Sequence, residues 1–148
     1  MINSRTRRVV WAVPVVCALL LCLPGAAAAD AVQDRVFDTR GDNVHLSRTP
    51  PPTASGHGWW LRGSSDAELA DVTVQLQVLN NGNWVDVGPP GRKRVKPGGG
   101  SANRANARYL CANSLQVNWR SVIDVDLVGY ADSSNVAVTP PRLLSCGA

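Results

Sequence analysis

Two stretches of the chain alternate hydrophobic and polar residues with a period of two. In residues 71–79 the hydrophobic positions are Val72, Val74, Leu76 and Val78. In residues 117–128 they are Trp119, Ile123, Val125 and Leu127, with the small residue Ser121 on the same face. This period is typical of a β-strand that buries one face and exposes the other. We therefore predict two long strands over these residues.

Turn residues divide the rest of the chain into short segments. Asn80-Asn81-Gly82-Asn83 predicts a tight hairpin because Asn and Gly tolerate a positive φ. The returning strand, 84–87, is expected to end at Pro89-Pro90-Gly91, and residues 92–95 to form a short edge strand. Further strand candidates are residues 35–37, 43–46, 59–62, 107–111, 136–138 and 142–146. About seven strands and no convincing helix predict an all-β fold. We expect a small antiparallel β-sandwich, immunoglobulin-like in a loose sense, with one disulfide.

The N-terminal segment has the pattern of a secretory signal peptide. Arg5, Arg7 and Arg8 precede an uncharged apolar run over residues 9–23, and small residues follow at 26–29. The alternative is a membrane anchor, but the apolar run is short for a span. We predict a signal peptide over 1–29, a Pro-rich, partly ordered arm over 30–57 and the sandwich domain over 58–148. The pattern leaves the export route open.

Charge and cysteine content limit the classes of function. The chain has 148 residues and a net charge of +4, but three of its 15 basic residues and none of its 11 acidic ones lie in the predicted signal peptide. The rest therefore carries a net charge of only +1, which is no argument for a nucleic-acid partner. Cys111 and Cys146 are the only cysteines outside the signal peptide and are expected to form a disulfide in an exported protein.

The residues that could carry catalysis are few. His45 and His57 are the only histidines, and we expect both to be solvated in the Pro/Gly-rich arm. Without a neighbouring Cys or Glu they make a poor metal site, so we predict no metal and no cofactor. Asp124, Asp126 and Asp132 could serve a small hydrolase only if they line a cleft with another acid or a histidine. A solvated strand face explains them more simply, so we predict no enzyme.

Two further clusters have simple structural explanations. Arg92, Lys93, Arg94 and Lys96 fit a charged edge strand, and the absence of interleaved aromatic residues disfavours single-stranded nucleic acid. Arg40-Gly41-Asp42 spells the integrin-binding tripeptide, but three residues match by chance too easily to count.

The tryptophans give the best indication of function. Trp84 and Trp119 lie at positions expected to face the core. Trp59 and Trp60 are adjacent in a predicted strand, so one should face the core and the other should face outward. An outward tryptophan on an exported sandwich can stack on a sugar ring or anchor a protein. We therefore take Trp59 and Trp60 as the candidate ligand-binding residues.

The chain also resembles small secreted proteins of unknown function from actinomycete-type bacteria. The resemblance rests on an excess of Arg over Lys and on three segments: residues 59–63, 106–111 and 119–129. It covers about residues 58–148 and implies export and a compact domain with a disulfide, but no catalytic residues.

We expect a secreted, monomeric, non-catalytic binding module of the cell envelope or extracellular space, whose partner is a polysaccharide or an extracellular protein. A small secreted hydrolase, or a structural or inhibitory protein, is the alternative.

Overall fold

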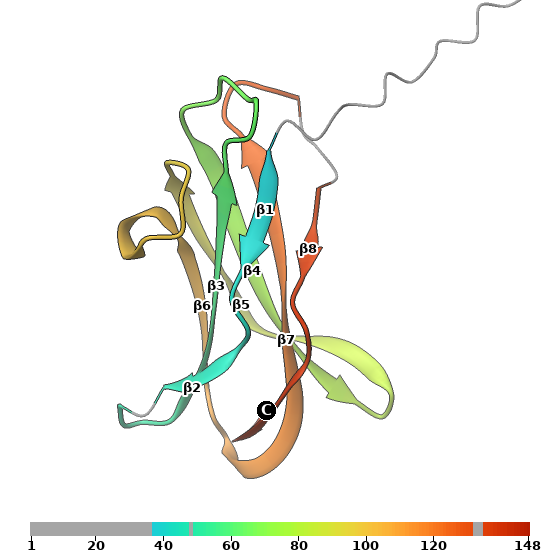
Figure 1. Cartoon of the computed structure of the whole chain (residues 1–148). Coiled ribbons are helices and arrows are strands. Elements are labelled where there is room, and N and C mark those ends of the chain that lie inside the picture. Colours follow the sequence, from blue (N-terminus) through green and yellow to red (C-terminus); the bar gives the residue numbers. More distant parts are fainter. Residues whose placement is uncertain (1–36, 48, 132–134) are drawn as a thin grey trace, which may run out of the picture. The chain divides into compact units, whose positions relative to one another are not determined.

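The protein is described by a computed structural model, which places residues 37–47, 49–131 and 135–148. These residues form two antiparallel sheets packed against each other (Figure 1), which confirms the predicted all-β sandwich. Sheet A contains β1 (Asp38–Gly41), β2 (His45–Ser47), β3 (Thr53–Leu61) and β6 (Ala105–Leu110). Sheet B contains β4 (Ala70–Asn80), β5 (Asn83–Val95), β7 (Asn113–Leu127), β8 (Ala137–Val138) and β9 (Arg142–Gly147). A 3-10 turn, η1 (Ser101–Asn103), precedes β6.

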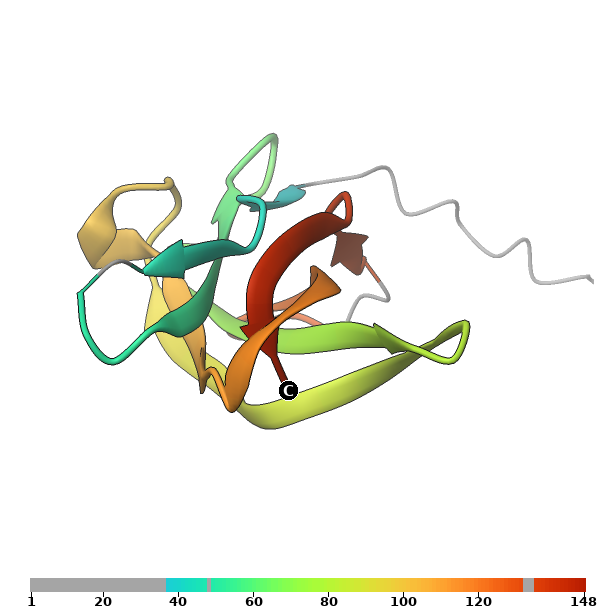
Figure 2. The ribbon, with the colours of Figure 1, turned by 90° about the horizontal axis from the view of Figure 1, so that it is seen from below.

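The two strands with the clearest alternation form the centre of sheet B. β4 pairs with β7 over its whole core-facing length, so that Val74 lies opposite Ile123. On β4 the alternating residues Val72, Val74, Leu76 and Val78 are buried, and on β7 Trp119, Ser121, Ile123 and Val125 are buried, while the residues between them lie on the other face. The predicted hairpin is confirmed: β4 turns into β5 through Asn81 at φ 49° and Gly82 at φ 80°. Figures 1 and 2 both show the tip of this hairpin extending beyond the rest of the domain.

β5 is longer than the sequence indicates. It continues through Pro89 and Pro90 instead of ending there, and it joins residues 84–87 and 92–95 into one strand. β5 is an edge strand that pairs only with β4, and its register shifts between Val74 and Leu76 of β4. An edge position and a local irregularity both accommodate proline, which has no N–H to donate. The predicted edge position of residues 92–95 is confirmed.

Sheet A is built around β3. β1 and β2 follow each other along one edge of β3, and β6 pairs along the other edge. Residues 30–57 were predicted to form a Pro-rich, partly ordered arm, but residues 38–41, 45–47 and 53–57 are strands of this sheet. Residues 30–36 and the predicted signal peptide lie outside the described residues. The sandwich therefore includes at least the second half of the expected arm.

The core lies between the sheets and is anchored by two tryptophans. Trp60 of β3 and Trp119 of β7 are both fully buried. Each indole N–H is satisfied by a backbone carbonyl, with Trp60 donating to Val95 at 3.2 Å and Trp119 donating to Cys146 at 2.9 Å. A buried indole needs such a partner, because an unpaired polar group in the core is costly.

The predicted disulfide between Cys111 and Cys146 is confirmed. Cys111 immediately follows β6 of sheet A, and Cys146 lies in β9 of sheet B. The bond therefore joins the two sheets covalently at one end of the sandwich.

β3 approaches sheet B closely because glycines replace side chains on its inner face. A Cβ added to Gly56 would collide with the Ser121 hydroxyl, and one added to Gly58 would lie 2.7 Å from both Val74 and Ile123. Since alternate residues of a strand point to opposite faces, the residue between these glycines, His57, faces away from sheet B.

Candidate functional site

The outer face of sheet A carries an imidazole that is well shielded from solvent. His57 lies in the middle of β3, between the two glycines that face the core, and only 8% of its surface is exposed. A buried histidine requires hydrogen-bond partners for its ring nitrogens. The partners of the His57 ring must therefore come from the side chains that surround it.

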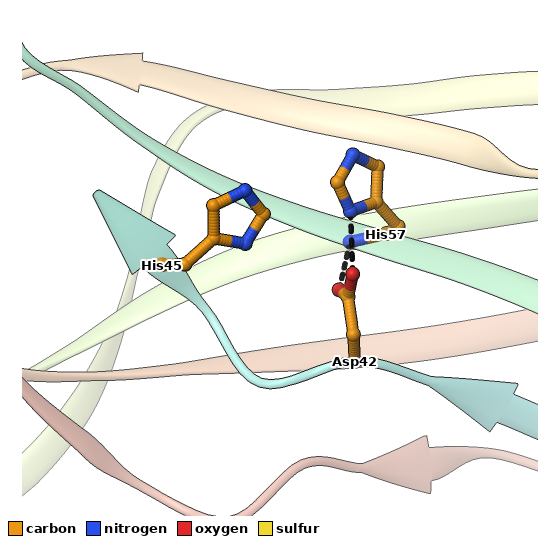
Figure 3. A group of neighbouring side chains, drawn as sticks. All are labelled: Asp42, His45 and His57. Carbon is orange, nitrogen blue, oxygen red and sulfur yellow. Dashed lines mark hydrogen bonds and ion pairs between the residues drawn. The ribbon is translucent and has the colours of Figure 1, made fainter. Parts of the chain in front are cut away.

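Asp42 is the direct partner of His57. It follows β1, where the pairing of Gly41 with Gly58 brings it beside His57. The Asp42 carboxylate accepts the backbone N–H of His57 at 2.9 Å on Oδ1, and Oδ2 lies 2.7 Å from His57 Nδ1. The backbone N–H of Asp42 also donates to the His57 carbonyl at 3.2 Å. Two hydrogen bonds to the carboxylate, drawn in Figure 3, and one between the backbones thus hold Asp42 beside His57.

His45 completes the group. It begins β2 and lies opposite Ser55 of β3, two residues from His57 along that strand. Its ring stacks on the His57 ring, with centroids 5.3 Å apart and planes inclined by 25°. Asp42, His45 and His57 each offer a ligand atom, and all these atoms lie within 4.8 Å of one another. We call these three residues the Asp–His cluster (Figure 3).

The serine next to this pair on the same face of β3, Ser55, is not oriented as a nucleophile toward His57. A carboxylate hydrogen-bonded to Nδ1 of a histidine is the orienting half of a catalytic triad, which also needs a nucleophile on the histidine. The hydroxyl beside His57 on the same face of β3 is that of Ser55, which is buried and donates to Asn106 Oδ1 at 3.0 Å. Its proton is therefore directed to an amide oxygen and not to the imidazole.

The proximity of these three residues was not predicted from the sequence. Both histidines were expected to be solvated: His45 is exposed as expected, whereas His57 is a buried strand residue with the His45 ring stacked on it. Asp42 was noticed only as part of a chance tripeptide. The signal that brings the three together is the antiparallel register of β1 and β2 on β3, which leaves no mark on composition or motif spacing.

The structure separates the two candidate ligand-binding tryptophans. Trp60 is fully buried in the core, so it cannot contact a ligand without unfolding. Trp59 points to the outer face of sheet A and is half-buried. The loop before η1 lies over its indole, since a Cβ at Gly99 would be 2.9 Å from Trp59 Cε2. Trp59 is therefore the one of the pair that can meet a ligand.

The other two tryptophans differ from each other as well. Trp119 is buried as predicted. Trp84 was expected in the core, but it is half-buried near the hairpin tip, and the Arg120 guanidinium lies 4.2 Å from its ring centroid. A cation held over an aromatic face is favourable, and it keeps this indole at the surface.

The carboxylates proposed for a hydrolase lie on the opposite side of the domain. Asp124 and Asp126 line an open depression on the outer face of sheet B, together with Asp71 and the basic residues Arg92, Lys93 and Arg94. Asp132 lies outside the described residues. Arg94 binds Asp71 at 2.6 Å and 2.8 Å through two nitrogens, and this hydrogen bonding lowers the pKa of Asp71. An acid catalyst has the opposite shift, so this lowered pKa does not favour Asp71 as a proton donor.

Comparison with protein-family models, with curated proteins and with solved structures finds no match in any of the three. Within the described residues, no helix has the length and apolar character required to cross a bilayer.

Proposed function

We propose that this chain is an exported, non-catalytic binding module that acts at the cell envelope or in the extracellular space. The observation that carries this proposal is the part of the Trp59 indole that stays exposed on the outer face of sheet A, beside the loop that covers the rest of the ring. Trp59 lies two residues from His57 on the same face of β3, so a flat aromatic surface adjoins the hydrogen-bonding groups of the Asp–His cluster. An aromatic face beside polar groups suits the stacking and hydrogen bonding that bind a sugar ring.

Two features support export. The N-terminal residues 1–29 have the charge and hydropathy pattern of a signal peptide. The Cys111–Cys146 disulfide suits an oxidising compartment, since cytosolic thiols are kept reduced. The bacterial origin suggested by the sequence resemblance would place such a module among secreted actinomycete proteins.

We take a polysaccharide of the cell envelope or the environment as the ligand, with an extracellular protein as the alternative partner. The test is a titration of the secreted protein with soluble glycans and cell-wall fragments, followed by intrinsic tryptophan fluorescence. We expect one class of polymer to shift the emission, and the shift to disappear in Trp59→Ala.

Trp84→Ala is the matched control because Trp84 is also half-buried but lies on the other sheet. It should retain the polymer-induced shift. If no polymer changes the emission, or if Trp59→Ala responds like the unmodified protein, sugar binding at this surface is refuted.

A further inference from the structure

We propose that the Asp–His cluster binds one divalent transition-metal ion of the Zn²⁺ or Cu²⁺ type. Asp42, His45 and His57 supply one carboxylate oxygen and two imidazole nitrogens, with all ligand atoms within 4.8 Å of one another. This inference goes beyond the proposed polymer binding and does not depend on it.

The spacing of the ligand atoms is close to what such an ion requires. Zn–N and Zn–O bonds of about 2.0–2.2 Å in a tetrahedron place neighbouring ligand atoms about 3.4 Å apart. The widest separation in the cluster exceeds this by about 1.4 Å. His45 is exposed at the start of β2, so its side chain can rotate to close this gap.

The other two ligands are held in place before any ion arrives. The Asp42 carboxylate is fixed by the backbone N–H and the ring of His57, and His57 is buried in the central strand of sheet A. Rigid ligands lose little conformational entropy on binding, which favours affinity. On binding, the Nδ1···Oδ2 hydrogen bond is exchanged for one bond from each atom to the ion, and the neutral ring carries its proton on Nε2 instead of Nδ1, while the hydrogen bond from the His57 backbone N–H to Oδ1 is kept.

The donor set determines the class of ion. Two imidazoles and one carboxylate suit Zn²⁺ or Cu²⁺, whereas Ca²⁺ and Mg²⁺ prefer sites built from oxygen. Three protein ligands leave at least one coordination position for water or for a group from a bound molecule. The cluster borders the same outer face as Trp59, so that position would lie beside the proposed ligand surface.

The test is isothermal titration calorimetry of the tag-free, full secreted protein with ZnCl₂ and, separately, with CuCl₂. We expect one ion per chain. The chain has only two histidines, and both are in the cluster, so any imidazole-dependent binding reports on this site. Copper-nitrogen coupling from two imidazoles in the electron paramagnetic resonance spectrum would identify the ligands directly.

Variants separate the site from non-specific binding. His45→Ala changes an exposed side chain, so it should leave the fold intact and weaken metal binding by at least about 10-fold. Asp42→Asn should weaken it as well, because the charged ligand oxygen is lost. Asp38→Asn is the matched control, since it removes another carboxylate at the start of β1, and it should leave the affinity unchanged.

The proposal is overturned if neither Zn²⁺ nor Cu²⁺ binds. It is also overturned if His45→Ala binds the ion with the same affinity as the unmodified protein. Trp59→Ala should retain metal binding while losing polymer binding. The two proposals can therefore fail independently of each other.

Discussion

Substituting Gly58 by alanine tests whether the sandwich depends on the close approach of β3 to sheet B. The added Cβ would lie 2.7 Å from methyl groups of both Val74 and Ile123, which is 0.7 Å less than the 3.4 Å at which ordinary van der Waals contact begins. Both side chains are fully buried, so neither can move aside freely. Overpacking of this kind costs about 1–3 kcal/mol, while replacing glycine by alanine recovers up to about 1 kcal/mol of unfolded-state entropy.

We therefore expect Gly58→Ala to lower the free energy of unfolding by about 1–2 kcal/mol. The assay is equilibrium unfolding in urea, followed by the fluorescence of the buried Trp60 and Trp119. Gly100→Ala is the control, because Gly100 has a φ of −65° and a Cβ there would meet nothing within 4 Å. The free energy of unfolding of this variant should be unchanged or slightly higher. The reasoning is refuted if Gly58→Ala is as stable as Gly100→Ala.

Three further variants test other parts of the structure. Replacing Cys111 and Cys146 by serine should lower the free energy of unfolding by about 4 kcal/mol, because the bond closes a loop with a sequence separation of 35; a urea-unfolding loss below about 1 kcal/mol would contradict this. Ser121→Ala should raise stability by about 1 kcal/mol in the same assay, because among the described residues its buried hydroxyl lacks a partner; a loss would show that the hydroxyl is satisfied. The pKa of Asp71, read by NMR titration of its carboxyl carbon, should lie below the usual aspartate value and return toward it in Arg94→Gln. Because this pKa is depressed in the folded state, the stability that the pair contributes is present above the unfolded-state pKa and is lost as pH falls through the folded-state pKa.

The regular part of the fold is readable from the sequence because it depends on local patterns. The alternation that defines β4 and β7 reflects a core on one side, and Asn81-Gly82 supplies the two positive φ angles that a tight hairpin needs. Cys111 and Cys146 are the only cysteines outside the predicted signal peptide, so an oxidising compartment is enough to predict their disulfide. Each of these features is encoded within a few neighbouring residues or in a simple count.

β3 was only partly predicted because its sequence lacks the usual strand signal. Gly56-His57-Gly58 places no hydrophobic side chain toward the core, since Val74 and Ile123 of the opposite sheet fill that space. A glycine-rich stretch normally reads as a loop. The partner sheet makes it a strand, and that information is not local.

The Asp–His cluster was missed for a related reason. Asp42 and His57 are 15 residues apart, and they meet because β1 and β3 pair in one particular register. A shift of β1 by one residue relative to β3 would turn the side chains of β1 to the opposite face relative to those of β3, so that Asp42 and His57 would no longer meet. No spacing rule on the sequence alone contains this register.

The projecting β4–β5 hairpin offers a site for protein engineering. Asn81 and Gly82 at its tip are exposed, and a Cβ at Gly82 would meet nothing within 4 Å. The entropic cost of lengthening a surface loop rises only slowly with its length, so this turn should accept an inserted peptide tag or reporter sequence. An insertion there would leave the outer face of sheet A uncovered, so that the protein could be immobilised on a sensor surface with Trp59 and the Asp–His cluster accessible.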